Sequence, residues 1–223
     1  MFYPNKMVSV RPDDKVLEIG PGASPHPRSN AFLELKFDSD HIKVAQRGGG
    51  LADGVFGDRP IFYYDGNIFP FRDGEFDYVI CSHVVEHVDN PEFFMREIFR
   101  VGKGRGYIEY PLITYEYMYS FDVHKSFVKF NLNDKALVYL NKSEYQFQEY
   151  SPIHLLFHKM LENGWDDLCA SNNELFFEGF EFERAFDVRE ARGIAELCPS
   201  SSVLTRKSSL RRLILRVMNK LKI

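Results

Sequence analysis

The chain has 223 residues, of which 44% are hydrophobic and 15% aromatic, and its net charge is −4. This is enough for one large domain with its own core. It has no run of about 18 uncharged apolar residues and no apolar signal core near its start, which argues against a transmembrane helix and against secretion. Three widely spaced cysteines are typical of reduced thiols, so a cytoplasmic location is expected.

The charge is unevenly distributed along the chain. The last 18 positions hold seven basic residues and no acid, which leaves 21 basic and 32 acidic residues in the first 205. Because an acidic body repels phosphates, no specific nucleic-acid binding is expected. The tail over 206–223 pairs basic residues with an apolar helical face. It is expected either to dock on an anionic membrane surface or a partner, or to act as a passive solubilising tail.

The first half of the chain predicts a mostly parallel sheet flanked by helices. Apolar runs predict five strands, at 16–19, 31–35, 61–64, 76–81 and 107–110. Helical spacing of apolar residues, opened by Asn90-Pro91, predicts a helix that ends near Val101. A short helical turn is expected at 28–30 and a loop at the triple glycine 48–50.

The pattern changes after the fifth strand. Two strands at 126–131 and 135–139 predict a hairpin, 152–161 a helix, 180–186 a half-buried antiparallel strand, and 208–222 an amphipathic helix. We expect a single domain over 1–200, with its binding half at about 12–112 and a substrate-side elaboration at about 113–190. Residues 201–223 form the basic tail.

The segment Val16–Gly22 carries the most information about function. An apolar run ends in an acid, Glu18, and is followed by Gly20 and Gly22. This predicts a buried strand that breaks into a tight turn, where the glycines remove the Cβ atoms that would keep a ligand away. A nucleotide-like cofactor is the ligand to suspect.

Five segments in one order resemble the class I S-adenosylmethionine-dependent methyltransferases, and in particular the methyltransferase type 11 branch. They are Val16–Gly22, Asp65–Phe71, Arg72–Val79, Ser82–Val88 and Glu97–Val101. The resemblance implies a Rossmann-like α/β fold, with a mostly parallel twisted sheet flanked by helices and a β-hairpin/helix insertion after the fifth strand. It implies S-adenosylmethionine as cofactor and S-adenosylhomocysteine as product.

The resemblance also implies roles for residues on the methionine side of the cofactor. Gly20 and Gly22 would let the loop pass beneath the methionine part. Glu18 would orient that loop or reach the amino group through water, although it could be only a loop brace. His83, which follows the fourth strand, would line the methyl-donor pocket.

Further acids are implied on the adenosine side. Glu34, or Asp38 or Asp40, would hold the ribose hydroxyls, although Glu34 could be a plain surface charge. Asp65 would accept from the adenine amino group, with Gly66 or Asn67 offering backbone nearby. Since Asp-Gly favours turns, Asp65 could also be a simple turn residue.

Residues 83–87 also spell the H-x-x-E-H pattern of some zinc peptidases. That chemistry needs two histidines on one helical face, whereas His83 closes a buried strand. No metal site is therefore expected, and His87 is interpreted as structural.

Methyl transfer mainly requires that two partners be positioned and water excluded, but a hydroxyl acceptor also needs a base. His124, in the region after the fifth strand, is the candidate base, supported by Asp122, Tyr115 or Tyr117. An ordinary surface or packed histidine is the alternative. His154 and His158 are interpreted as surface residues.

The expected function is methyl transfer to a small molecule or to a glycan or lipid precursor. One alternative is an inactive protein that binds S-adenosylmethionine as a sensor or scaffold. A second is a nicotinamide-dependent oxidoreductase, which would need a third glycine and an open helix start where Ser24-Pro25 stands. The sequence does not indicate an oligomeric state.

Overall fold

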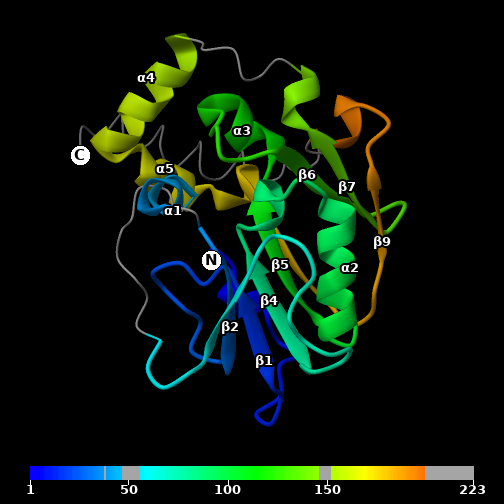
Figure 1. The fold of residues 1–223 in the computed structure, drawn as a ribbon. Coiled ribbons are helices and arrows are strands. Elements are labelled where there is room, and N and C mark those ends of the chain that lie inside the picture. The colour runs from blue at the N-terminus through cyan, green and yellow to red at the C-terminus, as the bar shows by residue number, and fades with distance from the viewer. Residues whose placement is uncertain (38, 47–55, 146–151, 199–223) are drawn as a thin grey trace, which may run out of the picture.

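A six-stranded sheet forms the centre of the molecule (Figure 1). The computed structural model describes residues 1–37, 39–46, 56–145 and 152–198. The strand order is β3-β2-β1-β4-β5-β8, in which the first five strands are parallel and β8 is antiparallel to β5. The strands are β1 (Val16–Ile19), β2 (Ala31–Leu35), β3 (Ile61–Tyr64), β4 (Tyr78–Ser82), β5 (Gly106–Pro111) and β8 (Phe177–Phe182).

The central strands are buried along their length, as strands covered on both faces must be. The predicted bounds differ from the structure by one or two residues at β5 and β7, and at two further strands as follows. β4 begins at Tyr78 rather than at 76. Asp77 lies in a bend, where its amide donates to the carbonyl of Lys15 at 2.9 Å and its carboxylate accepts from the amide of Lys15 at 3.0 Å. The strand predicted at 180–186 runs from Phe177 to Phe182, and the chain then leaves the sheet.

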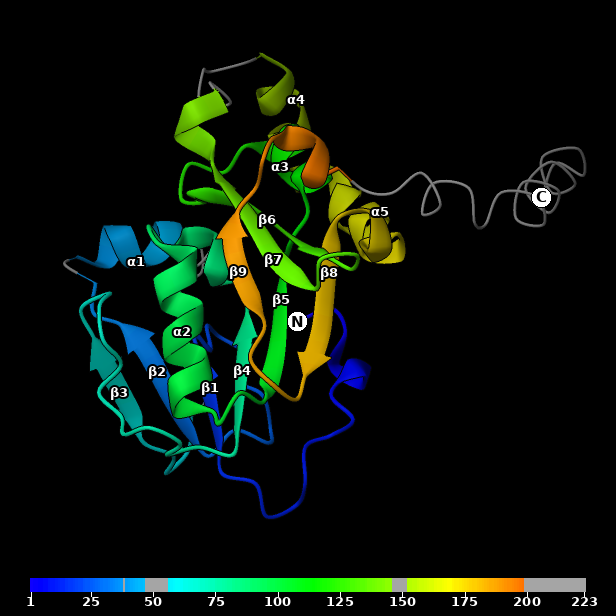
Figure 2. The ribbon, with the colours of Figure 1, turned by 90° about the vertical axis from the view of Figure 1, so that its right-hand side faces the viewer.

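Helix α2 (Pro91–Val101) covers one face of the sheet (Figure 2). Its predicted cap is confirmed, because the side chain of Asn90 accepts from the amide of Phe93 at 2.9 Å. Its apolar stripe enters the main core through Phe94, Met95, Ile98 and Val101. The opposite face of the sheet packs against the N-terminal segment, where Tyr3, Met7 and Val10 contact Val16, Tyr78, Ile80 and Tyr107.

A second, three-stranded sheet follows the order β6-β7-β9. The predicted hairpin is confirmed as β6 (Ser126–Asn131) and β7 (Ala136–Asn141), and β9 (Asp187–Glu190) adds parallel to β7. Figure 2 shows β9 running beside α2. Val128 and Leu137 join the main core, so the hairpin is fastened to the large sheet.

The remaining helices are α1 (Asp40–Gln46), α3 (Ile113–Tyr119), α4 (Pro152–Met160) and α5 (Asp166–Ser171). The predicted helix at 152–161 is confirmed as α4, whereas α1, α3 and α5 were not predicted. The helical turn expected at 28–30 is absent, and that stretch forms bends and a turn. The loop at 48–50 and the tail at 201–223 lie outside the described residues.

Within the described parts of the chain, no helix is long and apolar enough to cross a membrane.

Candidate functional site

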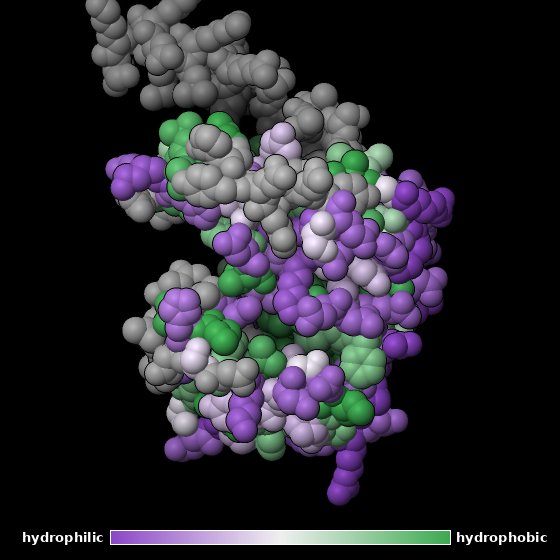
Figure 3. All heavy atoms as spheres, turned by 45° about the horizontal axis from the view of Figure 1, so that its top comes forward, coloured by the Kyte–Doolittle hydropathy of each residue, from purple (hydrophilic) through white to green (hydrophobic). Residues whose placement is uncertain are grey.

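A cavity of about 1000 Å³ lies at the carboxyl ends of the parallel strands. β1 and β4 are neighbours there, and the strand order reverses between them. Ligands of open α/β sheets bind at this kind of switch point, because the loops on either side leave in opposite directions. The face seen in Figure 3 is hollowed between its upper and lower halves.

The glycine loop after β1 borders this cavity. Gly20 has a φ of +62° and Gly22 a φ of +56°, so both occupy the left-handed region that side chains disfavour. A Cβ atom on Gly20 would lie 2.5 Å from Cγ2 of Val84, whereas one on Gly22 would meet nothing within 4 Å. Gly20 is therefore required where the loops after β1 and β4 meet, and Gly22 leaves its side of the loop open.

Glu18 is buried at the base of the same loop and lines the cavity. Its Oε2 accepts from the amide of His26 at 2.8 Å and from the hydroxyl of Ser29 at 2.7 Å. Burial raises the pKa of Glu18, although these hydrogen bonds oppose the shift. The structure thus gives Glu18 the role of a loop brace, while its direct contact with a cofactor stays a prediction.

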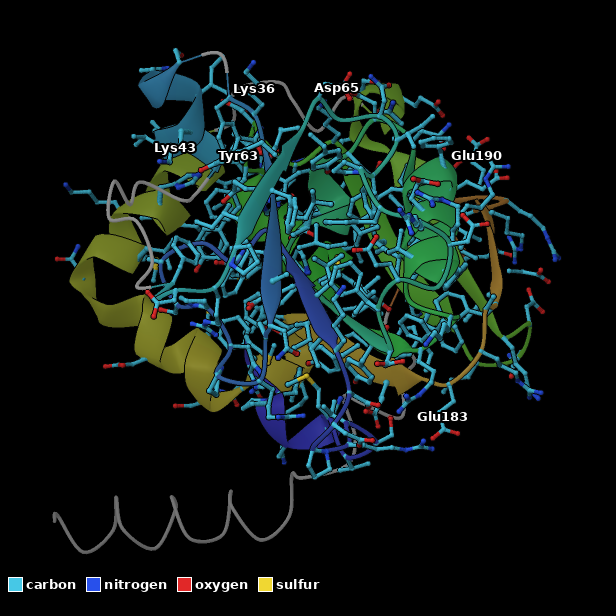
Figure 4. The ribbon with its side chains drawn as sticks, turned by 60° about the horizontal axis from the view of Figure 1, so that its bottom comes forward. Lys36, Lys43, Tyr63, Asp65, Glu183 and Glu190 are labelled. Carbon is cyan, nitrogen blue, oxygen red and sulfur yellow. The ribbon has the colours of Figure 1, made fainter. Side chains whose placement is uncertain are left out.

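The adenosine-side residues lie at the ends of β2 and β3. Glu34 is buried, next to last in β2, and lines the cavity together with Asp65, Gly66 and Asn67. Asp65 accepts from the amide of Asn67 at 3.0 Å, which forms a turn around Gly66. Figure 4 shows Asp65 at the rim of the molecule, just after β3. Asp38 lies outside the described residues.

His83 follows β4 and joins two buried carboxylates. Its Nε2 is 3.0 Å from Oε1 of Glu109, and its Nδ1 is 3.5 Å from Oε1 of Glu86. Burial opposes a charge on the imidazole, but the two carboxylates outweigh it and raise the pKa of His83 to about 9. His83 thus lines the cavity as a cation between two carboxylates, while its place beside the methyl donor stays a prediction.

Glu86 and His87 form a 3-10 helix with Val85 directly after His83. Glu86 is fully buried, and no hydrogen-bond donor reaches either of its oxygens. Nδ1 of His87 is likewise buried without a partner. Burial lowers the pKa of His87 to about 4, and the nearby His124 adds to that shift. His87 is therefore a neutral imidazole with unused hydrogen-bonding capacity.

His124 reaches the cavity from the segment between α3 and β6. Its ring packs edge-on against that of His87, with centroids 4.5 Å apart. Nδ1 of His124 donates to Oε1 of the buried Glu116, and Oε2 of Glu116 accepts from Nζ of Lys142 at 2.8 Å. In the neutral imidazole this hydrogen bond leaves the lone pair on Nε2. His124 lines the cavity, together with the glycine loop.

Sequence reasoning missed Glu116 and Lys142 and named other supports for His124. Tyr115 lines the cavity, but the residue bonded to His124 is Glu116. Glu116 was missed because α3 was not predicted: its aromatic and β-branched residues do not favour a helix. His158 is half-buried, and its Nε2 lies 2.7 Å from the carbonyl of Tyr119.

Comparison with known proteins finds a family match over part of the chain. Residues 38–109, about a third of the chain, match the type 11 methyltransferase family, described as "Methyltransferase domain". No curated protein matches the chain.

Several solved structures show weaker likeness. An S-adenosylmethionine-dependent methyltransferase from Methanosarcina mazei is 22% identical over 60% of this chain and 74% of its own, with a TM-score of 0.36. One from Thermotoga maritima is 18% identical over 49% of each chain, with a TM-score of 0.31. A complex of the Haloferax volcanii Trm112 methyltransferase activator with a methyltransferase gives 18% identity over 46% of each chain, with a TM-score of 0.33.

The chain spans about half the length of the Haloferax and Thermotoga proteins that it matches. At these TM-scores the likenesses carry no argument, and the assignment rests on the family match, the strand order and the glycine loop. Together these findings support a class I S-adenosylmethionine-dependent methyltransferase, with S-adenosylmethionine as its cofactor.

The residues present fit that cofactor. Gly22 has a positive φ, and a Cβ atom added there would meet nothing within 4 Å, so the loop leaves room for a ligand to approach its backbone closely. Glu34 supplies a buried carboxylate at the end of β2, and the cavity is large enough for a nucleoside with an amino-acid arm.

Proposed function

We propose that this protein transfers the methyl group of S-adenosylmethionine to a small molecule or to a glycan or lipid precursor. The observation that carries the proposal is the continuity of one cavity. The glycine loop and Glu34 line it, and so do His87 and His124. A cofactor and an acceptor can therefore meet inside a single space from which protein walls exclude water.

The residues on the cofactor side bind and orient S-adenosylmethionine. The backbone at Gly20 and Gly22 forms the floor beneath the methionine arm, and Glu34 accepts hydrogen bonds from the two ribose hydroxyls. Asp65, whose own oxygen already closes a turn with Asn67, places the loop backbone at Gly66 next to the adenine edge. The bound cofactor supplies an electrophilic methyl group.

The residues on the acceptor side are aromatic or imidazole groups. Tyr115, Phe121 and Phe177 line the cavity near His124 and favour an acceptor with an apolar part. Nε2 of His124 presents a lone pair to the acceptor, because Glu116 fixes the other nitrogen as the donor. A lone pair at this point serves a nucleophile that carries a proton, such as a hydroxyl.

Isothermal titration with S-adenosylhomocysteine tests the cofactor site. We expect saturable binding by one ligand per chain, and the absence of heat with folded protein would overturn the proposal. A screen of candidate acceptors with radiolabelled methyl donor then separates an enzyme from a sensor. Binding without transfer to any acceptor would favour the sensor.

The tail over 206–223 is proposed to place the enzyme at an anionic surface that carries its acceptor. Its basic residues beside apolar ones support this. Truncation at residue 205 should abolish binding to anionic vesicles and leave binding of S-adenosylhomocysteine unchanged. Unchanged vesicle binding would contradict the tail's role.

A further inference from the structure

The acceptor wall of the cavity holds three metal-ligating side chains from two separate segments. Glu86, His87 and His124 each offer one ligand atom, and these atoms lie within 4.8 Å of one another. Two imidazoles and one carboxylate are a donor set that divalent transition metals favour. We propose that Glu86, His87 and His124 bind a divalent transition-metal ion at the acceptor end of the cavity.

The state of Glu86 is the first independent support. A buried carboxylate without a hydrogen-bond donor is costly, because it has lost its hydration and gained nothing in return. Neither oxygen of Glu86 has a hydrogen bond, and its charge is balanced at a distance by His83, whose Nδ1 lies 3.5 Å from Oε1. Nε2 of His87 stands 3.9 Å from the same oxygen. A metal ion between Glu86 and the imidazoles of His87 and His124 would give this carboxylate the direct partner that it lacks.

The surroundings of His124 are the second support. Ligating histidines almost always donate their other ring N–H to a carboxylate, which fixes the tautomer and makes the free nitrogen a better ligand. Glu116 does this for His124, and Lys142 in turn holds Glu116. This arrangement prepares Nε2 of His124 as an electron-pair donor.

The backbone also fixes the two segments together. The amide of Lys125 donates to the carbonyl of Glu86 at 2.7 Å, so His124 is held beside Glu86 and His87 by a main-chain bond. Binding would draw the three ligand atoms, which lie within 4.8 Å of one another, to about 2 Å from one ion. The sequence argument against a metal considered His83 as the second histidine, whereas the structure supplies His124 from a distant segment.

The site remains open on the cavity side. The side chains of His87 and His124 are 14% and 12% exposed, and all three residues line the cavity. A fourth position is thus available for an oxygen atom of the acceptor. This use of the site rests on the proposed function, and it assigns His124 as a ligand rather than a free base. A hydroxyl bound to the ion would lose its proton more readily than a free one.

Metal binding can be measured without the methyl donor. The full chain, freed of metal with a chelator, is titrated with Co²⁺ in the visible range and with Zn²⁺ by calorimetry. We expect one ion per chain, and a dissociation constant at least about 100-fold weaker in E86Q and in H124N. The matched controls H41N and E92Q alter exposed side chains on α1 and α2 and should bind like the parent chain.

Two outcomes would overturn the proposal. One is that the parent chain binds no metal at millimolar concentration, and the other is that E86Q and H124N bind metal as tightly as the parent chain does. Titration of the same samples with S-adenosylhomocysteine reports on folding and on the proposed function separately. A chain that binds the nucleoside but not the metal loses only this inference, and one that binds the metal alone loses the proposed function. If E86Q does not fold, H124N decides.

Discussion

Glu116 on α3 is bonded to His124, although the two side chains come from different segments of the chain. Both oxygens of this buried carboxylate are used, one by His124 and the other by Lys142 at 2.8 Å. Lys142 is itself only 1% exposed. The acceptor wall is thus built around a buried ion pair, and removal of one partner leaves the other charge uncompensated.

Replacement of Lys142 by methionine should therefore lower the free energy of unfolding by about 3–5 kcal/mol. The double variant E116Q/K142M should recover much of this loss, because it removes both charges together. Urea denaturation of the two single variants and the double variant gives the coupling between them. K125M is the control, since Lys125 pairs with Asp89 at the surface and should lose about 1 kcal/mol at most. Equal losses in K142M and K125M would contradict the buried-pair explanation.

Substitution of Gly20 by alanine tests the glycine loop. The positive φ and the 2.5 Å approach to Val84 should together weaken binding of S-adenosylhomocysteine at least about tenfold and lower stability by about 1–3 kcal/mol. The control is G193A, because Gly193 has an extended backbone with φ of 167° and no atom within 4 Å of an added Cβ. Calorimetric titration and thermal unfolding measure both effects.

The double variant G20A/V84A separates the two causes. It relieves the contact and keeps the strained φ, so it should recover part of the loss. Full recovery would show that the backbone conformation is unimportant, and G20A binding like the parent chain would contradict the loop's place in the cofactor site.

Glu34 is expected to hold the ribose. The variant E34Q keeps the shape of the side chain but loses its charge, and should bind S-adenosylhomocysteine about 10–100-fold more weakly, since hydrogen bonds to charged groups contribute about 1.5–3 kcal/mol. The analogue without the ribose 2′-hydroxyl should bind the parent chain less tightly than S-adenosylhomocysteine does, and E34Q should discriminate less between the two.

E190Q is the matched control, because Glu190 is an exposed carboxylate on β9 (Figure 4). If E34Q discriminates between the two ligands as the parent chain does, the ribose is held by another residue. Asp38 and Asp40 would then be examined in the same way.

The sequence predicts the large sheet because its strands are local. Val16–Ile19 and Ala31–Leu35 are apolar runs bounded by glycine, proline or charge, and burial on both faces demands that pattern. The predicted strand ends are less accurate where side-chain contacts set them. One example is Asp77, which precedes β4 and whose carboxylate accepts from the amide of Lys15.

The acceptor wall could not be predicted in this way. Glu116 lies eight residues from His124 and 26 from Lys142, and neither spacing corresponds to one helix or one strand. Ile113–Tyr119 is rich in aromatic and β-branched residues, so local propensity does not favour the helix it forms. Packing and a buried ion pair place Glu116, and such contacts are set by the whole fold.

The pH dependence of stability should show the contribution of Glu97 on α2. Its Oε2 accepts from the amide of Phe69 at 2.8 Å and from Arg100 at 2.6 Å, which fastens the loop after β3 to the helix. The hydrogen bonds from Arg100 lower the pKa of Glu97 below its ordinary value of 4.5, and the amide of Phe69 adds to this against the effect of burial.

A carboxylate whose folded pKa is depressed stabilises the fold above its unfolded pKa, and this contribution is lost as the pH falls through the folded pKa. The parent chain should therefore be more stable than E97Q by about 1–3 kcal/mol at pH 7. The difference should shrink as the pH falls below about 4.5. Urea denaturation at several pH values measures it, with E92Q as control because Glu92 forms only an exposed pair with Arg96. A difference between the parent chain and E97Q that stays constant down to pH 3 would show that the charge on Glu97 contributes nothing and that only the shape of its side chain matters.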